Sequence, residues 1–261
     1  MDNSGDSVSP GATSVDVTNS TITNIGENPF NGSQHGVAIY YHAFATGSSV
    51  TGTISGNTAS KYQKGGIVVN GPGSSASVSG NTVTGQGPVD YIAQNGIQIG
   101  FGAAGQIMRN TVTKNSYIGD NDASSTGVSI YGGCGYPLVT GVQIVKNAIG
   151  STTPADGNDI GVALANYDAG CDGPPSTATN NKVINNTITN TETTNVSGDT
   201  YPCGYQAGIL DSGVNDKLIN NDISGVGYTP AATCGSSGGT TVVTIDTSST
   251  TAAKVHANTV P

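Results

Sequence analysis

Carboxyl groups gather in the second half of the chain, in a pattern that suits chemistry on a sugar polymer. The catalytic candidates are Asp168, Asp172 and Asp211, with Asp159 nearby. Two carboxyl groups that face one another across a glycosidic bond supply the acid and the base of hydrolysis. Carboxylate oxygens also suit Ca²⁺, so calcium is a candidate cofactor, although none is required and the metal ligands stay unknown.

Tyrosines of the same region would bind the substrate, because flat aromatic faces pack well against sugar rings. The expected substrate-binding residues are Tyr131, Tyr136, Tyr167, Tyr201 and Tyr205. A second cluster lies earlier in the chain and consists of Tyr40, Tyr41, His42, Lys61, Tyr62 and Lys64. This second cluster could bind an acidic sugar, but the simpler interpretation is an amphipathic loop that covers the start of the fold.

The elements that must position these residues are short strands, because two phrases alternate along the chain. One phrase is an apolar residue, two further residues, an Asn, a small residue and a second apolar residue. Its asparagines are Asn57, Asn81, Asn110, Asn147, Asn186, Asn221 and Asn258. The other phrase is Gly, apolar, any residue, apolar, as in Gly66-Ile-Val-Val69 and Gly96-Ile-Gln-Ile99. The period of two predicts strands, and the Gly-rich stretches between them predict bends.

Repeats that contain only strands predict a β-solenoid. The asparagines recur every 24 to 39 residues, and a single coil cannot bury its own apolar stripe. Coils stacked about 4.8 Å apart would bury Val and Ile in continuous columns. We expect each repeated Asn to adopt the left-handed backbone conformation at a bend. We also expect it to bond with the Asn of the neighbouring coils in a ladder.

The two phrases resemble the repeats of right-handed parallel β-helices of the pectate-lyase-like superfamily. The resemblance covers residues 15–261 and implies an all-β fold, a single right-handed parallel β-helix of about eight coils with an Asn ladder and loop insertions. Residues 1–14 are expected to be a disordered or non-native N-terminal segment. The family usually caps its first coil with an amphipathic helix, which the sequence lacks, so we expect both ends to be capped by missing segments or by a partner.

The resemblance does not decide the activity, because the superfamily includes lyases, hydrolases, esterases, epimerases, adhesins and non-enzymes. Its lyases usually have an Arg or Lys base beside Ca²⁺-binding Asp residues, whereas the one Arg in this sequence, Arg109, lies away from the Asp cluster. Its polygalacturonase-like hydrolases have a Gly-His-Gly motif, which Gln34-His35-Gly36 matches poorly. The sequence therefore leaves open whether the protein is an enzyme.

Asp211 is the catalytic candidate with the most specific signal. It occupies the slot that holds Ile99, Ile130 and Leu164 in earlier repeats, where an inward apolar residue is expected. A buried carboxylate is costly unless it has a partner. The simpler interpretation is that the register slips in this coil, so that Asp211 faces water.

The four cysteines are predicted to form two disulfides. Cys134 and Cys171 both follow the Gly-containing strand in adjacent coils, whereas Cys203 and Cys234 both precede it. This placement predicts the pairs Cys134–Cys171 and Cys203–Cys234, and no CxxC spacing supports a metal site instead. Disulfides indicate an oxidising compartment, so we expect a secreted or cell-surface protein. We also expect a bacterial source.

Composition excludes two classes of partner. Lys and Arg total 8 against 17 Asp and Glu, which gives a net charge of −9. A chain this acidic is not expected to present the broad basic surface that binds nucleic acid. No apolar run is long enough to span a membrane. The expected partner is therefore a polysaccharide or a cell-surface glycan.

The sequence thus predicts an extracellular, carbohydrate-interacting β-helix protein, with polysaccharide lyase or glycoside hydrolase activity through the Asp cluster if it is an enzyme. One alternative is a non-enzymatic structural or adhesive module of a larger surface protein. A second alternative is ice binding. Thr-x-Thr pairs such as Thr82-Val-Thr84 and Thr111-Val-Thr113 follow the repeated Asn, and they resemble the ice-binding face of β-helical antifreeze proteins.

Overall fold

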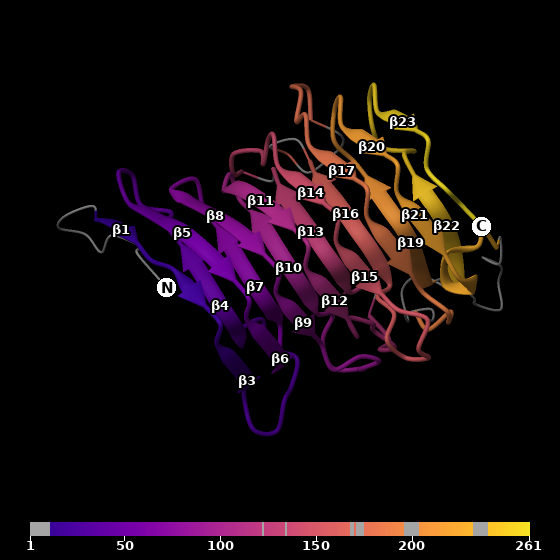
Figure 1. Cartoon of the computed structure of the whole chain (residues 1–261), viewed down its shortest axis with the longest axis horizontal. Helices are drawn as coiled ribbons and strands as arrows, with labels where there is room; N and C mark the ends of the chain where they lie inside the picture. Colours follow the sequence, from indigo (N-terminus) through magenta and orange to yellow (C-terminus); the bar gives the residue numbers. More distant parts are fainter. Residues whose placement is uncertain are drawn as a thin grey trace.

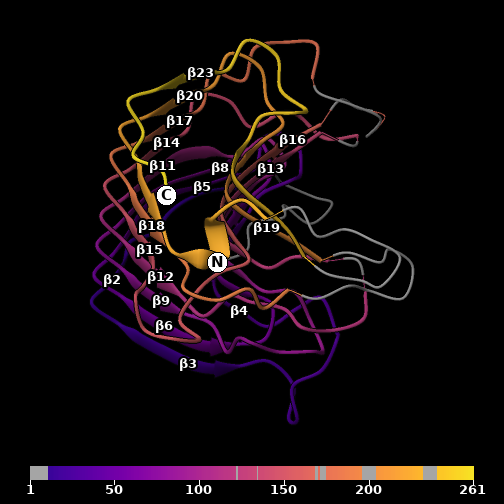
Figure 2. The ribbon, with the colours of Figure 1, turned by 90° about the vertical axis from the view of Figure 1, so that its right-hand side faces the viewer.

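The computed structural model describes residues 11–121, 123–133, 135–167, 170, 175–195, 204–231 and 240–261. Over these residues the chain winds into one parallel β-helix, as the repeats predict, and three parallel sheets run along a common axis (Figure 1). A view turned by 90° shows the coils stacked behind one another (Figure 2). The first strand begins at Ala12, within the segment predicted to precede the β-helix.

We name the sheets A, B and C in the order in which each coil visits them. Sheet A consists of β4 (Val37–His42), β7 (Gly65–Asn70), β10 (Asn95–Gly100), β13 (Thr126–Gly132), β16 (Ile160–Asn166), β19 (Gly204–Asp211) and β22 (Thr240–Asp246). Sheet B consists of β1 (Ala12–Ser14), β2 (Val17–Thr18), β5 (Ser49–Ser55), β8 (Ser74–Ser79), β11 (Ala104–Met108), β14 (Gln143–Val145), β17 (Lys182–Ile184), β20 (Lys217–Ile219) and β23 (Lys254–His256). Sheet C consists of β3 (Thr21–Ile25), β6 (Thr58–Tyr62), β9 (Thr82–Thr84), β12 (Thr111–Thr113), β15 (Ala148–Gly150), β18 (Thr187–Thr189) and β21 (Asp222–Ser224).

The strands are connected by bends and loops. One short 3₁₀ helix, η1 (Val226–Tyr228), follows β21. Across the described ranges no helix has the length and apolar character needed to cross a membrane.

The core consists of columns in which apolar side chains stack on their counterparts in adjacent coils. In sheet A, Ile97 pairs with Ile67 on one side and with Val128 on the other, and none of the three is exposed to solvent. Sheet B has equivalent columns, for example Ile107 beside Ile144. Because successive side chains of a strand point to opposite faces, the alternation that predicts the strands also predicts which side chains lie inside.

The predicted asparagine ladder is confirmed at the corner between sheets B and C. At Asn110, the backbone N–H and the side-chain Nδ2 both donate to Asn147 Oδ1, at 2.9 and 3.0 Å, and Nδ2 also donates to the Val78 carbonyl at 3.1 Å. The same pair of bonds joins Asn57, Asn81, Asn110, Asn147, Asn186, Asn221 and Asn258 in one series. Each Asn therefore satisfies backbone groups that the bend would leave unpaired.

The left-handed residue at this corner precedes the ladder Asn, which corrects the expectation that the Asn itself adopts that conformation. Arg109 (φ 53°), Lys146 (φ 56°) and Asn185 (φ 57°) each precede a ladder Asn, and Gly56 and Gly80 hold the same position in earlier coils. Left-handed angles are uncommon for residues with a Cβ. The ladder Asn thus contributes hydrogen bonds, while its neighbour provides the turn.

Replacing a central ladder residue is expected to destabilise the fold more than replacing the last one. Asn147→Ala would leave the backbone N–H of Asn110 without an acceptor in a buried site and would leave Asn110 Nδ2 with only its bond to the Val78 carbonyl, at a cost of about 2–4 kcal/mol in the free energy of unfolding. Asn258→Ala removes the same two bonds from Asn221, but Asn258 is partly exposed, so water can replace it and we expect a loss below about 1 kcal/mol. Guanidinium denaturation measures both, and equal losses would contradict the role given to burial.

Candidate functional site

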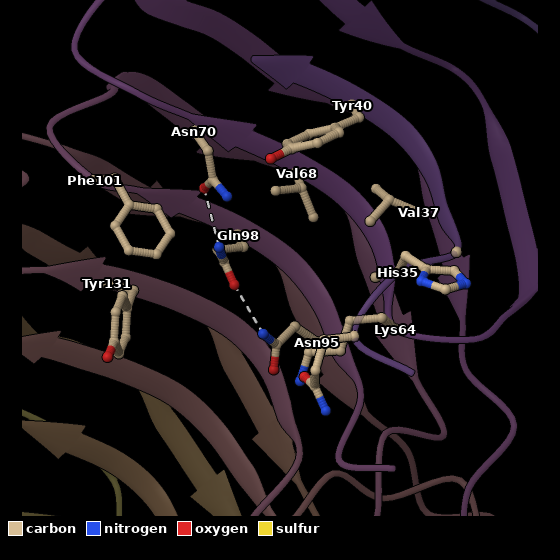
Figure 3. Close-up of a pocket in the computed structure, with 13 residues that line it drawn as sticks. His35, Val37, Tyr40, Lys64, Val68, Asn70, Asn95, Gln98, Phe101 and Tyr131 are labelled. Carbon is tan, nitrogen blue, oxygen red and sulfur yellow. Dashed lines mark hydrogen bonds between the residues drawn. The ribbon is translucent and has the colours of Figure 1, made fainter. Parts of the chain in front are cut away.

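A groove of about 580 Å³ lies on the outer face of sheet A, over strands β4, β7, β10 and β13 (Figure 3). Its lining residues are Gln34, His35, Gly36, Val37, Tyr40, Lys64, Gly65, Val68, Asn70, Asn95, Gln98, Phe101 and Tyr131. The strand alternation explains this lining. Ile67 and Val69 of β7 point into the core, so Val68 and Asn70 point outward.

Amide side chains form the floor of the groove. Asn95 Nδ2 donates to Gln98 Oε1 at 2.8 Å, and Gln98 Nε2 donates to Asn70 Oδ1 at 3.0 Å. Thr126 Oγ1 donates to Asn95 Oδ1 at 3.0 Å. The dashed lines in Figure 3 mark the first two of these bonds. Three amides are thereby held in defined orientations along the floor of the groove.

Aromatic rings line the edge of sheet A at the carboxyl ends of the strands. The centroid of the Phe101 ring lies 5.3 Å from that of Tyr131, 4.9 Å from that of Tyr136 and 5.9 Å from that of Phe44. The series continues from Phe44 to His42 at 4.7 Å. We call His42, Phe44, Phe101, Tyr131, Tyr136 and Tyr167 the aromatic wall. The contacts among Phe44, Phe101, Tyr131, Tyr136 and Tyr167 are edge-to-face except for the tilted pair Phe44–Phe101, and such contacts stabilise the rings against one another.

Lys64 and His35 lie on the opposite side of the groove from Phe101 and Tyr131 (Figure 3). Lys64 Nζ donates to the Ala93 carbonyl at 2.7 Å, and burial lowers the pKa of Lys64. His35 Nε2 lies 2.8 Å from Glu27 Oε1. None of the side chains that line the groove is an Asp or a Glu. The described lining can therefore bind and orient a ligand, but it does not supply the pair of carboxyl groups that glycoside hydrolysis needs.

The structure divides the cluster of Tyr40, Tyr41, His42, Lys61, Tyr62 and Lys64 between two environments. Tyr40 and Lys64 line the groove, and His42 belongs to the aromatic wall. Tyr41 and Tyr62 point into the core instead, where neither is exposed. Tyr40 and His42 lie on a strand of sheet A rather than on the expected covering loop.

The five predicted substrate-binding tyrosines also separate. Tyr131 lines the groove, and Tyr136 and Tyr167 belong to the aromatic wall. Tyr205 donates its hydroxyl to Asp246 Oδ2 at 2.6 Å, and Tyr201 lies outside the described residues. Phe44, Phe101 and the three amides were not predicted from the sequence. For the amides, the signal would have been their place on the Gly-containing strands, where Val68 and Gln98 occupy equivalent outward slots, whereas Phe44 and Phe101 lie just beyond the ends of β4 and β10.

Two of the three catalytic candidates, Asp168 and Asp172, lie outside the described residues, as do all four cysteines. The third, Asp211, pairs with Leu164 in unbroken register and is fully buried. The expectation of a register slip that turns Asp211 to water is therefore wrong. The carboxyl group occupies an inward slot at the end of β19, away from the groove.

Asp211 meets a second buried carboxyl group, Asp216. Asp211 Oδ1 accepts the Gly213 N–H at 2.8 Å, while Asp216 Oδ1 accepts Thr179 Oγ1 and the Asn181 N–H, both at 2.6 Å. Among the described residues, neither Asp211 Oδ2 nor Asp216 Oδ2 accepts a hydrogen bond from an N–H or O–H group. Burial raises the pKa of both groups, that of Asp216 to about 7. The raised pKa of both groups favours a pair in which one carboxyl group keeps its proton, and the influence of Asp211 further raises the pKa of Asp216.

Asp159 is also buried, but it belongs to a different set of polar side chains from Asp211 and Asp216. Its Oδ2 accepts the backbone N–H groups of Tyr117 and Ser125, both at 2.8 Å, and Asn195 Nδ2 at 3.2 Å. Burial raises its pKa to about 7, against the opposing effect of these bonds. Asp159 does not line the groove, so its carboxyl group acts as an internal acceptor.

Two further expectations are a metal site and an ice-binding face. Throughout the described residues, no three His, Cys, Asp or Glu side chains gather as metal ligands would. On sheet C, the register aligns Thr58, Thr82 and Thr111 in one exposed column. Ala148 and Asp222 interrupt this column in later coils.

Comparisons with protein-family models, with curated proteins and with solved structures found no match to this chain. The resemblance to the pectate-lyase-like superfamily therefore rests on the repeat phrases and on the parallel β-helix that they form.

The carboxyl pair predicts that stability falls as the pH rises. The pKa of Asp216 is raised from 3.8 to about 7, so the stability that its proton contributes is fully present below pH 3.8 and is lost as the pH rises from there through about 7. In Asp216→Asn, the amide can donate to Asp211 at any pH. We expect this variant to be more stable than the wild type at pH 8, by roughly 1–3 kcal/mol, and to lose that advantage at pH 4.

Urea denaturation between pH 4 and pH 8 measures this difference. Asp222→Asn, which removes a carboxylate from the exposed first position of β21, is the control for the change in net charge. A difference between Asp216→Asn and wild type that does not vary with pH would show that the pair holds no proton.

Proposed function

We propose that this protein binds a polysaccharide in the groove on the outer face of sheet A. The observation that carries the proposal is the combination of an amide floor, Asn70, Asn95 and Gln98, with an adjacent aromatic wall. Sugars present hydroxyl groups at their rims and C–H groups on their faces. Amide side chains form hydrogen bonds with the hydroxyl groups, and aromatic faces pack against the C–H groups.

The groove crosses strands of successive coils, so its long direction follows the axis of the β-helix. Tyr40, Val68 and Gln98 form one outward row across three coils. A linear chain that lies along this row meets a new side chain at every coil, about 4.8 Å further on. This repeating contact suits a polymer of repeating units better than a compact metabolite.

The proposal is binding, with no catalytic step assigned. Asp159 and Asp211 are buried and bonded inside the β-helix, and the lining side chains include no carboxyl group. Asp168 and Asp172 remain candidates for hydrolase or lyase activity, with Ca²⁺ as a candidate cofactor. The expected setting is secreted or at the cell surface, with the two predicted disulfides, and a non-enzymatic adhesive module is the role that fits the described groove best.

The aromatic contribution is tested at Tyr131. Tyr131→Ala removes a ring from the junction of the groove and the aromatic wall, so the affinity for a bound oligosaccharide is expected to fall about tenfold or more. Tyr131→Phe keeps the ring and is expected to stay within about threefold of the wild type. Isothermal titration against a panel of neutral and acidic oligosaccharides measures the affinities. Equal affinity of all three proteins for every ligand that binds would contradict the proposal.

The amide floor is tested by a matched pair of glutamines. Gln98→Ala removes the side chain that bonds both Asn95 and Asn70, whereas Gln143→Ala removes an exposed glutamine of sheet B. We expect a loss of about tenfold in affinity for the first variant and none for the second. Chromatography of the ligand after incubation shows whether it is recovered intact. Cleavage that Gln98→Ala abolishes would make the groove an active site instead.

A further inference from the structure

Three lysines stack in register on the outer face of sheet B. Lys182, Lys217 and Lys254 are the first residues of β17, β20 and β23, and the strand register pairs Lys182 with Lys217 and Lys217 with Lys254. The residues that follow the first two, Val183 and Leu218, are buried in the core. Because side chains alternate along a strand, the lysines point outward. We call these three residues the lysine stripe.

The positive charge of the chain is concentrated around this stripe. Arg109 and Lys146 occupy the left-handed bend positions directly after β11 and β14 of the same sheet. With the stripe they make five of the eight Lys and Arg residues of a chain whose net charge is −9. Strands β8, β11, β14, β17, β20 and β23 contain no Asp or Glu.

This arrangement is electrostatically unfavourable in the free protein. Like charges directly opposite one another on adjacent strands repel, here at a spacing of about 4.8 Å. In the part of the chain that the structure describes, no member of the stripe makes an ion pair. Asp216 directly precedes Lys217, but its carboxyl group is buried and bonded to Thr179 and Asn181. An anionic partner would therefore relieve a repulsion that no described acidic side chain offsets.

The shape of the surface selects the kind of anion. The stripe is one lysine wide and runs along the axis of the β-helix. A parallel row of outward Val145, Ile184 and Ile219 lies beside it. A linear polymer with a negative charge on each repeating unit can place successive charges on successive lysines and its apolar ring faces on the adjacent row. An extended anionic surface would also meet the acidic remainder of the protein.

We propose that the lysine stripe binds a linear anionic polysaccharide along the axis of the β-helix. The proposal does not depend on the groove, because the stripe belongs to another sheet. Figure 2 shows β14, β17, β20 and β23 on one side of the solenoid and β13, β16 and β19 on another. The protein would then hold glycan chains on two separate faces.

The test compares dextran sulfate with dextran, which share a backbone and differ in charge. Biolayer interferometry on the full chain is expected to detect binding of dextran sulfate but not of dextran at the stripe. The double variant Lys182→Gln/Lys217→Gln is expected to lose about tenfold in affinity, and the wild-type affinity is expected to fall as salt is raised. Lys61→Gln/Lys114→Gln, which changes the net charge equally away from sheet B, should change the affinity less than about twofold.

Each other outcome overturns the proposal. Equal losses in the two double variants would show that only net charge matters, and unchanged affinity in Lys182→Gln/Lys217→Gln would show that the stripe is not the site. Tighter, stripe-dependent binding to phosphatidylglycerol vesicles than to dextran sulfate would assign the face to a membrane. Tyr131→Ala separates the two sites, because a groove variant should keep its affinity for dextran sulfate. Thermal unfolding of all variants checks that each remains folded.

Discussion

Each strand residue in the inner coils of this β-helix has a neighbour about 4.8 Å away in the coil on either side, and the rest of the structure depends on that spacing. A residue type can repeat along a column only if its side chain interacts favourably with a similar side chain in the next coil. Val and Ile do so by packing, as Ile67, Ile97 and Val128 show. Asn does so because an amide is both a donor and an acceptor, so Asn110 can accept from one coil and donate to the next. Charges are the groups that cannot repeat without a partner.

The buried carboxyl groups show how the β-helix accommodates acidic side chains in its core. Asp216 stands where Asn181 stands one coil earlier, and it accepts the Asn181 N–H as a ladder residue would. A carboxylate has no proton to donate onward, and burial raises the pKa of both Asp211 and Asp216, which favours a protonated carboxyl group in this pair. Asp211 lies in another column, beside Leu164, within the same coil as Asp216. The two buried carboxyl groups therefore belong to different columns that meet within one coil.

Much of the fold could be predicted from the sequence, because the two phrases report which side chains face inward. The ladder asparagines and the inward Ile and Val residues followed directly. The unbroken register at Asp211 could not be predicted, since it depends on a partner, Asp216, in the next bend. The groove was only partly predicted. Its floor lies in outward slots that no rule of burial constrains, and Phe44 and Tyr136 lie outside the strands.

The outer faces of sheets A and B differ in how favourably their stacked side chains interact. On sheet A, outward columns mix Val68, Gln98 and Tyr131, which are neutral and tolerate their neighbours without a ligand. On sheet B, Lys182, Lys217 and Lys254 repeat a single charge, which the spacing penalises. At physiological salt, interactions between exposed charges are screened beyond about 8 Å. The repulsion is therefore local to the stripe, and so is the attraction that offsets it. Only a ligand whose own charges repeat along the same line can exploit all three lysines at once.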